Sequence, residues 1–158
     1  MNPNSGRKYL QVPEYAERIS IDRPHIAIAL ADEVSLDISS KRKQIATKRT
    51  LEWFQQLSTN DTVNWNETSL FGVVPGHLES DNVREFTHNL LQLGAKGITV
   101  GGLHQGESEL SSKVIRHVRL AIDEWTSSDS KVPIIVQNVR TPIQVYTLPY
   151  VFLIFDIL

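Results

Sequence analysis

The chain has 158 residues, a net charge of −2 and a pI of about 6.2, and 41% of its residues are hydrophobic. This length suits one domain, and the balance of charges excludes a strongly basic nucleic-acid-binding protein, so any contact with RNA would depend on a local patch. The absence of cysteine excludes disulfides and thiolate zinc sites within the chain.

Neither end of the sequence predicts a secretory signal or a membrane segment. Residues 1–8 are polar, whereas a secretory signal needs an apolar core. Residues 145–158 are the most apolar stretch, but they fall short of the roughly 20 residues that a membrane span needs. We therefore expect a cytoplasmic protein with no membrane span.

The first half of the chain predicts a helix, a strand and a second helix. Residues 12–22 carry apolar side chains at helical spacing, and residues 25–31 are typical of a strand buried on both faces. The second helix begins after a cap at Ser39 or Ser40 and reaches about Leu57. Its predicted apolar stripe consists of Ala46, Thr50, Trp53, Phe54 and Leu57.

The second half continues the alternation. Residues 70–74 predict a strand that ends at Pro75-Gly76, and the helix after it ends at Gly94. Residues 97–100 predict a short strand that breaks on the glycine pair 101–102. A helix over about 108–125 and a strand over 132–137 complete the series.

Alternating helices and strands predict an α/β fold with a parallel sheet and right-handed crossovers. The four expected strands do not close a barrel of eight. This leaves two architectures open, a small open α/β sheet or part of a larger (β/α)8 barrel.

Two strand ends carry candidate ligand-binding residues. Asp32 and Glu33 follow the first strand, where a carboxylate can accept hydrogen bonds from the N–H groups of a purine-like base. Gly101 and Gly102 follow the third, where the loss of two Cβ atoms admits a flat ligand. The alternative readings are an acid that caps the next loop and a tight turn without a ligand.

Other polar features carry weaker signals. His77 is a candidate acid or base, although a single loop histidine is more often a surface residue. The basic cluster on the second helix could contact phosphate, but a solvated helix face is the favoured interpretation. That cluster comprises Lys41, Arg42, Lys43, Lys48 and Arg49. The histidines do not have the spacing of metal ligands.

Taken in order, these strand ends resemble the tRNA-guanine transglycosylase family, whose enzymes exchange a guanine in tRNA for queuine or a precursor. Residues 24–33 look like its "PDI…DE" strand, and residues 70–76 look like its "LFGIVQGG" segment. Residues 100–107 look like its "VGGLAVGE" segment and are the most specific match.

The resemblance implies part of a TIM (β/α)8 barrel. It implies that Asp32 recognises the base edge and that Gly101, Gly102 and Leu103 line the base pocket. The full-length family holds zinc in an inserted subdomain, but the Cys/His ligand set is absent here, so no cofactor or metal is expected in this chain.

The sequence also departs from the family pattern. Pro75 replaces a glutamine that hydrogen-bonds the base, and His77 replaces a glycine. The catalytic nucleophile of the family follows a "TP…V…FD" segment, which makes Asp156 the candidate nucleophile here, although residues 146–153 do not match. These departures make the chain similar to the accessory, non-catalytic subunit of eukaryotic queuine tRNA-ribosyltransferase.

From this resemblance we expect residues 1–142 to form a partial tRNA-guanine transglycosylase-like barrel domain, followed by an apolar tail of uncertain origin over residues 143–158. The implied partners are a catalytic subunit, in a heterodimer, and tRNA through that complex, with an association with the mitochondrial outer membrane. The alternative is a catalytic enzyme that uses Asp156 and is completed by another chain. A third possibility is that so short a piece of a barrel does not fold, because its sheet edges and interior stay open.

Overall fold

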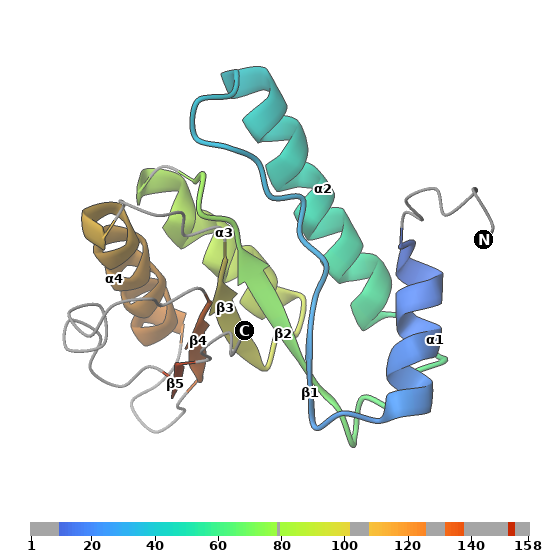
Figure 1. Cartoon of the computed structure of the whole chain (residues 1–158). Coiled ribbons are helices and arrows are strands. Elements are labelled where there is room, and N and C mark those ends of the chain that lie inside the picture. Colours follow the sequence, from blue (N-terminus) through green and yellow to red (C-terminus); the bar gives the residue numbers. More distant parts are fainter. Residues whose placement is uncertain (1–9, 79, 102–107, 126–131, 138–151, 154–158) are drawn as a thin grey trace.

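The computed structural model describes residues 10–78, 80–101, 108–125, 132–137 and 152–153. The bounds of the helices and strands are α1 Val12–Asp22, β1 Ile26–Ile28, α2 Ser40–Ser58, β2 Ser69–Val74, α3 Ser80–Gln92, β3 Gly97–Val100, α4 Ser108–Trp125, β4 Ile134–Val136 and β5 Phe152–Leu153. Helices and strands alternate from α1 to β4, and β5 is the next described element after β4 (Figure 1).

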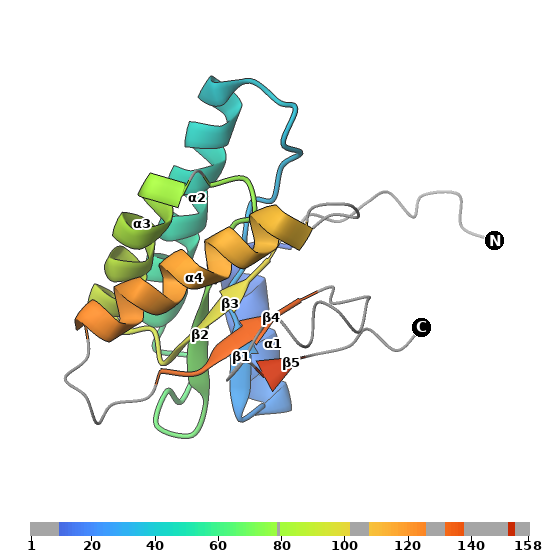
Figure 2. The same ribbon diagram turned by 90° about the vertical axis from the view of Figure 1, so that its left-hand side faces the viewer.

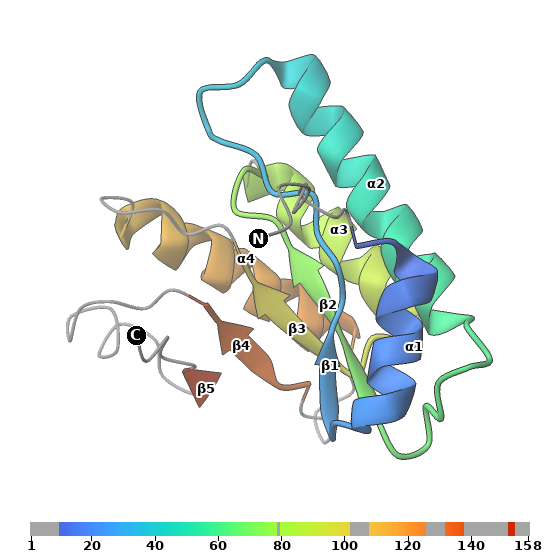
Figure 3. The ribbon, with the colours of Figure 1, turned by 45° about the vertical axis from the view of Figure 1, so that its right-hand side comes forward.

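The strands form one parallel sheet whose spatial order, β1-β2-β3-β4-β5, is also their order along the chain. Helices α2, α3 and α4 cover one face of this sheet, and α1 lies beside α2 near β1 (Figures 2 and 3). The predicted α/β fold with parallel (β/α) repeats is confirmed, and its architecture is that of part of a TIM barrel.

Side chains alternate strictly between the two faces of the sheet, as they must in extended chains. A Cβ at Gly72 would approach Leu90 of α3 to 2.8 Å, so the even-numbered residues of β2 face the helices. Val74 and its register partner Val100 belong to the same buried core. Val73, Thr99 and Gly101 therefore face the opposite side, which we call the inner face.

The first strand differs from the prediction. The sequence favoured a strand over residues 25–31 that is buried on both faces, whereas β1 has three residues and Ile26 is 46% exposed. Among the described strands β1 pairs only with β2, so its other edge and its inner face lack the neighbours that would bury them. The Tyr15 hydroxyl instead donates to the Ile28 carbonyl at 2.7 Å on that free edge.

Local signals for the helices are confirmed. The Ser39 hydroxyl accepts from the Arg42 amide at the start of α2, and Ala46, Thr50, Phe54 and Leu57 are buried. Trp53 of the predicted stripe is partly buried and packs against the same core. Gly94 ends the α3 segment with a φ of 91°, which a glycine adopts without a steric penalty.

The C-terminal stretch contributes one more strand than the sequence predicted. Phe152 and Leu153 of β5 pair in parallel with Ile135 and Val136 of β4. This strand lies within residues 143–158, the stretch expected to be an apolar tail of uncertain origin. No helix among the described residues is both long enough and apolar enough to cross a membrane.

Candidate functional site

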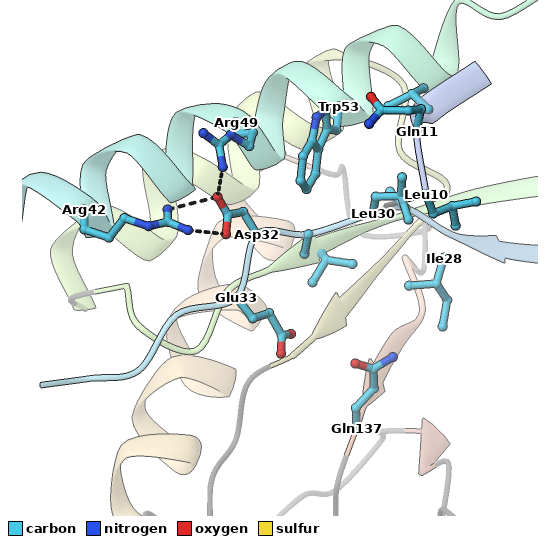
Figure 4. Close-up of a pocket in the computed structure, with 14 residues that line it drawn as sticks. Leu10, Gln11, Ile28, Leu30, Asp32, Glu33, Arg42, Arg49, Trp53 and Gln137 are labelled. Atoms are coloured by element: carbon cyan, nitrogen blue, oxygen red, sulfur yellow. Dashed lines mark hydrogen bonds and ion pairs between the residues drawn. The ribbon is translucent and has the colours of Figure 1, made fainter. Parts of the chain in front are cut away.

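A pocket of about 750 Å³ opens at the carboxyl end of the sheet, where parallel α/β proteins bind their ligands (Figure 4). Its residues come from the segment before α1, the end of β1, helix α2, β2 and the end of β4. We call it the strand-end pocket. It is lined by residues 10–12 and 28–33 and by Arg42, Arg49, Trp53, Val73 and Gln137.

Asp32 lies in this pocket as the sequence predicted, and α2 supplies two partners for it. Arg42 donates one N–H to each carboxylate oxygen, at 2.9 and 2.8 Å, and Arg49 donates to Oδ2 at 2.7 Å. The hydrogen bond from Arg42 lowers the pKa of Asp32, partly offset by burial, and the charges of Arg42 and Arg49 lower it further. Asp32 is therefore an anion that holds α2 against the end of β1.

Thr50 fixes the backbone of this acid. Its hydroxyl donates to the Ala46 carbonyl at 2.9 Å and accepts from the Asp32 amide at 3.0 Å. Arg49 also lies over the Trp53 ring, 5.9 Å from its centroid, at a distance typical of a cation–π contact. These contacts set the direction in which the Asp32 carboxylate points.

Glu33 takes a different direction from its neighbour. Its carboxylate lies against Gly101, in the space that a Cβ on residue 101 would occupy. Gly101 does not have a positive φ, so here the close approach of Glu33, and not backbone freedom, favours glycine. Close approach at this glycine pair was predicted for a flat ligand, and in this structure an acidic side chain makes it.

Several residues that line the pocket were not identified from the sequence as site residues, among them Arg42, Arg49 and Gln137. Arg42 and Arg49 were assigned to a solvated helix face, but they are seven residues apart, which places both on one face of α2. Two arginines seven residues apart, in the helix that follows a strand-end acid, are the signal that could have identified Arg42 and Arg49 as partners of Asp32. Gln137 follows β4 and carried no motif that could identify it.

His77 lies outside the strand-end pocket. It is buried and lines a second cavity of about 670 Å³, to which α2 and α3 contribute. The Thr47 hydroxyl donates to the Lys43 carbonyl at 2.9 Å, so it accepts from His77 Nε2 at 3.1 Å. Burial lowers the pKa of His77, and the ring is neutral at physiological pH.

The remaining predicted site residues, Gly102, Leu103 and Asp156, lie outside the described residues. Within the described part of the chain, no group of three His, Asp or Glu side chains is placed to hold a metal ion. The zinc that the family resemblance implies therefore has no donor set among these residues.

Comparison with known proteins places this arrangement in a family. Residues 2–148 match the family model described as queuine tRNA-ribosyltransferase. The chain is 30% identical over 111 residues to the queuine tRNA-ribosyltransferase of Haemophilus ducreyi, which covers 67% of this chain and 28% of that protein. It is 27% identical over 132 residues to that of Tolumonas auensis, covering 78% and 34%.

The protein of the same name from Chromobacterium violaceum is 28% identical over 107 residues. The chain spans about a third or less of the length of these curated relatives, between 28% and 34%. The family match covers all the strand ends described above, from Asp32 to Gln137. The chain belongs to the queuine tRNA-ribosyltransferase family.

Proposed function

We propose that this chain acts in the queuosine modification of tRNA, the exchange of guanine for queuine, as the non-catalytic partner of a catalytic queuine tRNA-ribosyltransferase. Family membership supports the pathway. The observation that carries the non-catalytic role is the double arginine clamp on Asp32, which occupies three of the acceptor positions of the expected base-recognising acid. Pro75 also supports the non-catalytic role, because it has no side-chain amide with which to bind a base.

The same pocket retains the capacity to hold a base. A carboxylate offers about four acceptor positions, and the arginines use three on Asp32. One position on Oδ1 stays available for an N–H group of a base. We propose Asp32, Gly101, Gly102 and Leu103 as the residues that surround it.

The proposed partner is a catalytic subunit in a heterodimer, and tRNA is bound by the complex. The pocket is consistent with a supporting role, since its charged side chains, Asp32, Glu33, Arg42 and Arg49, carry no net charge. Such a pocket does not attract the tRNA backbone by itself. From the family resemblance we propose a cytoplasmic complex that associates with the mitochondrial outer membrane.

Co-expression with a catalytic queuine tRNA-ribosyltransferase subunit tests the proposal. We expect the two chains to co-purify and to elute together in size-exclusion chromatography. Queuine incorporation into tRNA should be higher for the pair than for either chain alone. The matched controls are each chain alone, after circular dichroism has shown that this chain melts cooperatively.

Two outcomes would contradict this function. One is the absence of a complex together with unchanged queuine incorporation. The other is a covalent adduct between this chain alone and guanine-containing tRNA that Asp156→Asn abolishes. The second result would establish the catalytic alternative, in which an aspartate attacks the ribose.

A further inference from the structure

We infer that Glu33 and Gln137 are specificity-determining residues of the strand-end pocket and that together they bind the polar edge of a guanine-like base. The inference rests on the proposed function. It gives a specific role to Glu33, which the sequence indicated only as a strand-end acid, and adds Gln137, which no motif assigned to the site. It follows from their positions on either side of one strand end, from the face they share and from their chemistry.

The two residues flank the end of β3. Glu33 extends from the end of β1 past β2, and its carboxylate contacts Gly101. Gln137 follows β4 on the other side of β3. Its backbone N–H donates to the Val100 carbonyl at 3.1 Å. Figure 4 shows the Glu33 carboxylate and the Gln137 amide in the same part of the pocket, on the side away from Arg42 and Arg49.

Strand register places Gln137 on the inner face. Val100 pairs with Val136, and both belong to the core on the helix side of the sheet. The next residue of each strand, Gly101 and Gln137, therefore points to the inner face. Two residues before Gly101 on that face, the Thr99 hydroxyl is buried and has no hydrogen-bond partner within the described part of the chain.

The chemistry of the pair matches one edge of guanine. A carboxylate accepts hydrogen bonds, whereas a primary amide both donates and accepts. Guanine presents a carbonyl at C6, an N–H at N1 and an amine at C2. Glu33 accepts from the amine at C2, and the Gln137 side-chain amide donates to the C6 carbonyl.

The pocket around them favours a neutral ligand over a phosphate. The pocket is lined by two carboxylates, of Asp32 and Glu33, and by two guanidinium groups, of Arg42 and Arg49, so its charges balance. Trp53 and the aliphatic residues 28–31 supply the apolar part of the lining, as in ligand sites where a few polar groups fix the orientation.

The side-chain amide of Gln137 stands in for one that Pro75 cannot supply. The family resemblance implies a base-binding glutamine at position 75, and Pro75 does not line the pocket. Gln137 brings an amide to the same pocket from β4, two strands away from β2. In such a site the amide that binds the base follows β4 and not β2.

Equilibrium dialysis of the full chain against radiolabelled guanine, hypoxanthine and adenine tests the inference. Hypoxanthine lacks the C2 amine, and adenine also lacks the C6 carbonyl and N1–H. The wild type should bind guanine about tenfold more tightly than hypoxanthine, and adenine more weakly still. Glu33→Gln should abolish the preference for guanine over hypoxanthine, because it removes the anionic acceptor.

Gln137→Ala should weaken guanine and hypoxanthine equally, by about tenfold, because both keep the C6 carbonyl. Gln137→Glu tests the same contact with little change in volume and should weaken binding further by repelling that carbonyl. Glu17→Gln and Gln56→Ala are matched controls on exposed faces of α1 and α2. Thermal melts establish that each variant folds.

Each outcome decides the inference. If the wild type binds none of the bases, or if Glu33→Gln and Gln137→Ala keep wild-type affinities and ratios, the inference is wrong. Neither result affects complex formation with a catalytic subunit, which is measured separately. Conversely, loss of the guanine preference in Glu33→Gln, in a chain that forms no such complex, would support this inference and refute the proposed function.

Discussion

The carboxylate of Glu33 occupies the space that a side chain on Gly101 would need, so an acid that follows the first strand contacts the residue that follows the third. Strand β2 lies between these two strands in the sheet. The contact therefore crosses the inner face and joins two strands that share no backbone hydrogen bonds.

Gly101→Ala should cost less stability than Gly97→Ala. At residue 101 the new methyl group meets the flexible end of Glu33, whereas at residue 97 it meets the ring of the buried Phe71. We expect a loss of below ~1 kcal/mol for Gly101→Ala and ~1–3 kcal/mol for Gly97→Ala, as for other overpacked cores. Urea denaturation measures both, and equal losses would contradict the placement of Glu33.

Asp32→Asn should reduce the loss of folding stability at acid pH. The pKa of Asp32 is lowered in the folded chain, chiefly by the hydrogen bond from Arg42. Its contribution is therefore fully present above the ordinary aspartate value of about 4 and is lost as the pH falls through the lower folded pKa. Urea denaturation at pH 7 and at pH 3 should show a smaller decline for Asp32→Asn than for the wild type.

A salt titration serves as the control for that prediction. The side chains of Arg42 and Arg49 are 34% and 45% exposed, so salt screens their attraction to Asp32. At pH 7 the difference between wild type and Asp32→Asn should narrow in 1 M NaCl. A difference that is independent of both salt and pH would argue against the ion pairs.

Tyr15→Phe should destabilise the free edge of the sheet. The hydroxyl of Tyr15 donates a hydrogen bond to the Ile28 carbonyl, and the loss of this bond should cost about 1 kcal/mol at pH 7. Burial raises the pKa of Tyr15, so its contribution is present below pH 10 and is lost as the pH rises through the folded value. In thermal melts, the difference in melting temperature between the wild type and Tyr15→Phe should be smaller above pH 10 than at pH 7.

His77→Gln should reduce the loss of stability between pH 7 and pH 5. Burial lowers the pKa of His77, so the unfolded chain binds the proton more readily, and stability declines as the pH falls below about 6.5. The glutamine keeps a polar side chain next to Thr47 but does not titrate in this range. The other histidines are common to both proteins. The same loss of stability between pH 7 and pH 5 in both would therefore mean that folding does not lower the pKa of His77.

The alternation of elements, the strand ends and the helix caps could be predicted because each depends on neighbours in the sequence. Gly94 and Ser39 are local signals, and both act where predicted. The exposure of Ile26 could not be predicted, because burial of a strand depends on which strands lie beside it.

The partners of Asp32 show the same limit within the site. The sequence placed Asp32 at a strand end, but the orientation of its carboxylate depends on how α2 docks against β1. Only the docked helix shows that Arg42 and Arg49 face the acid. For Gln137 the deciding fact is the register between β3 and β4, which no local pattern contains.

The sheet order has a consequence for how the protein is made. Because each strand pairs with the one synthesised just before it, no strand waits on the ribosome for a partner still to be translated. The first three strands and the helices between them can make their mutual contacts as soon as Val100 has emerged. This part of the chain can therefore fold in step with translation, and Asp32 can be clamped by α2 before Gly101 is added to the chain.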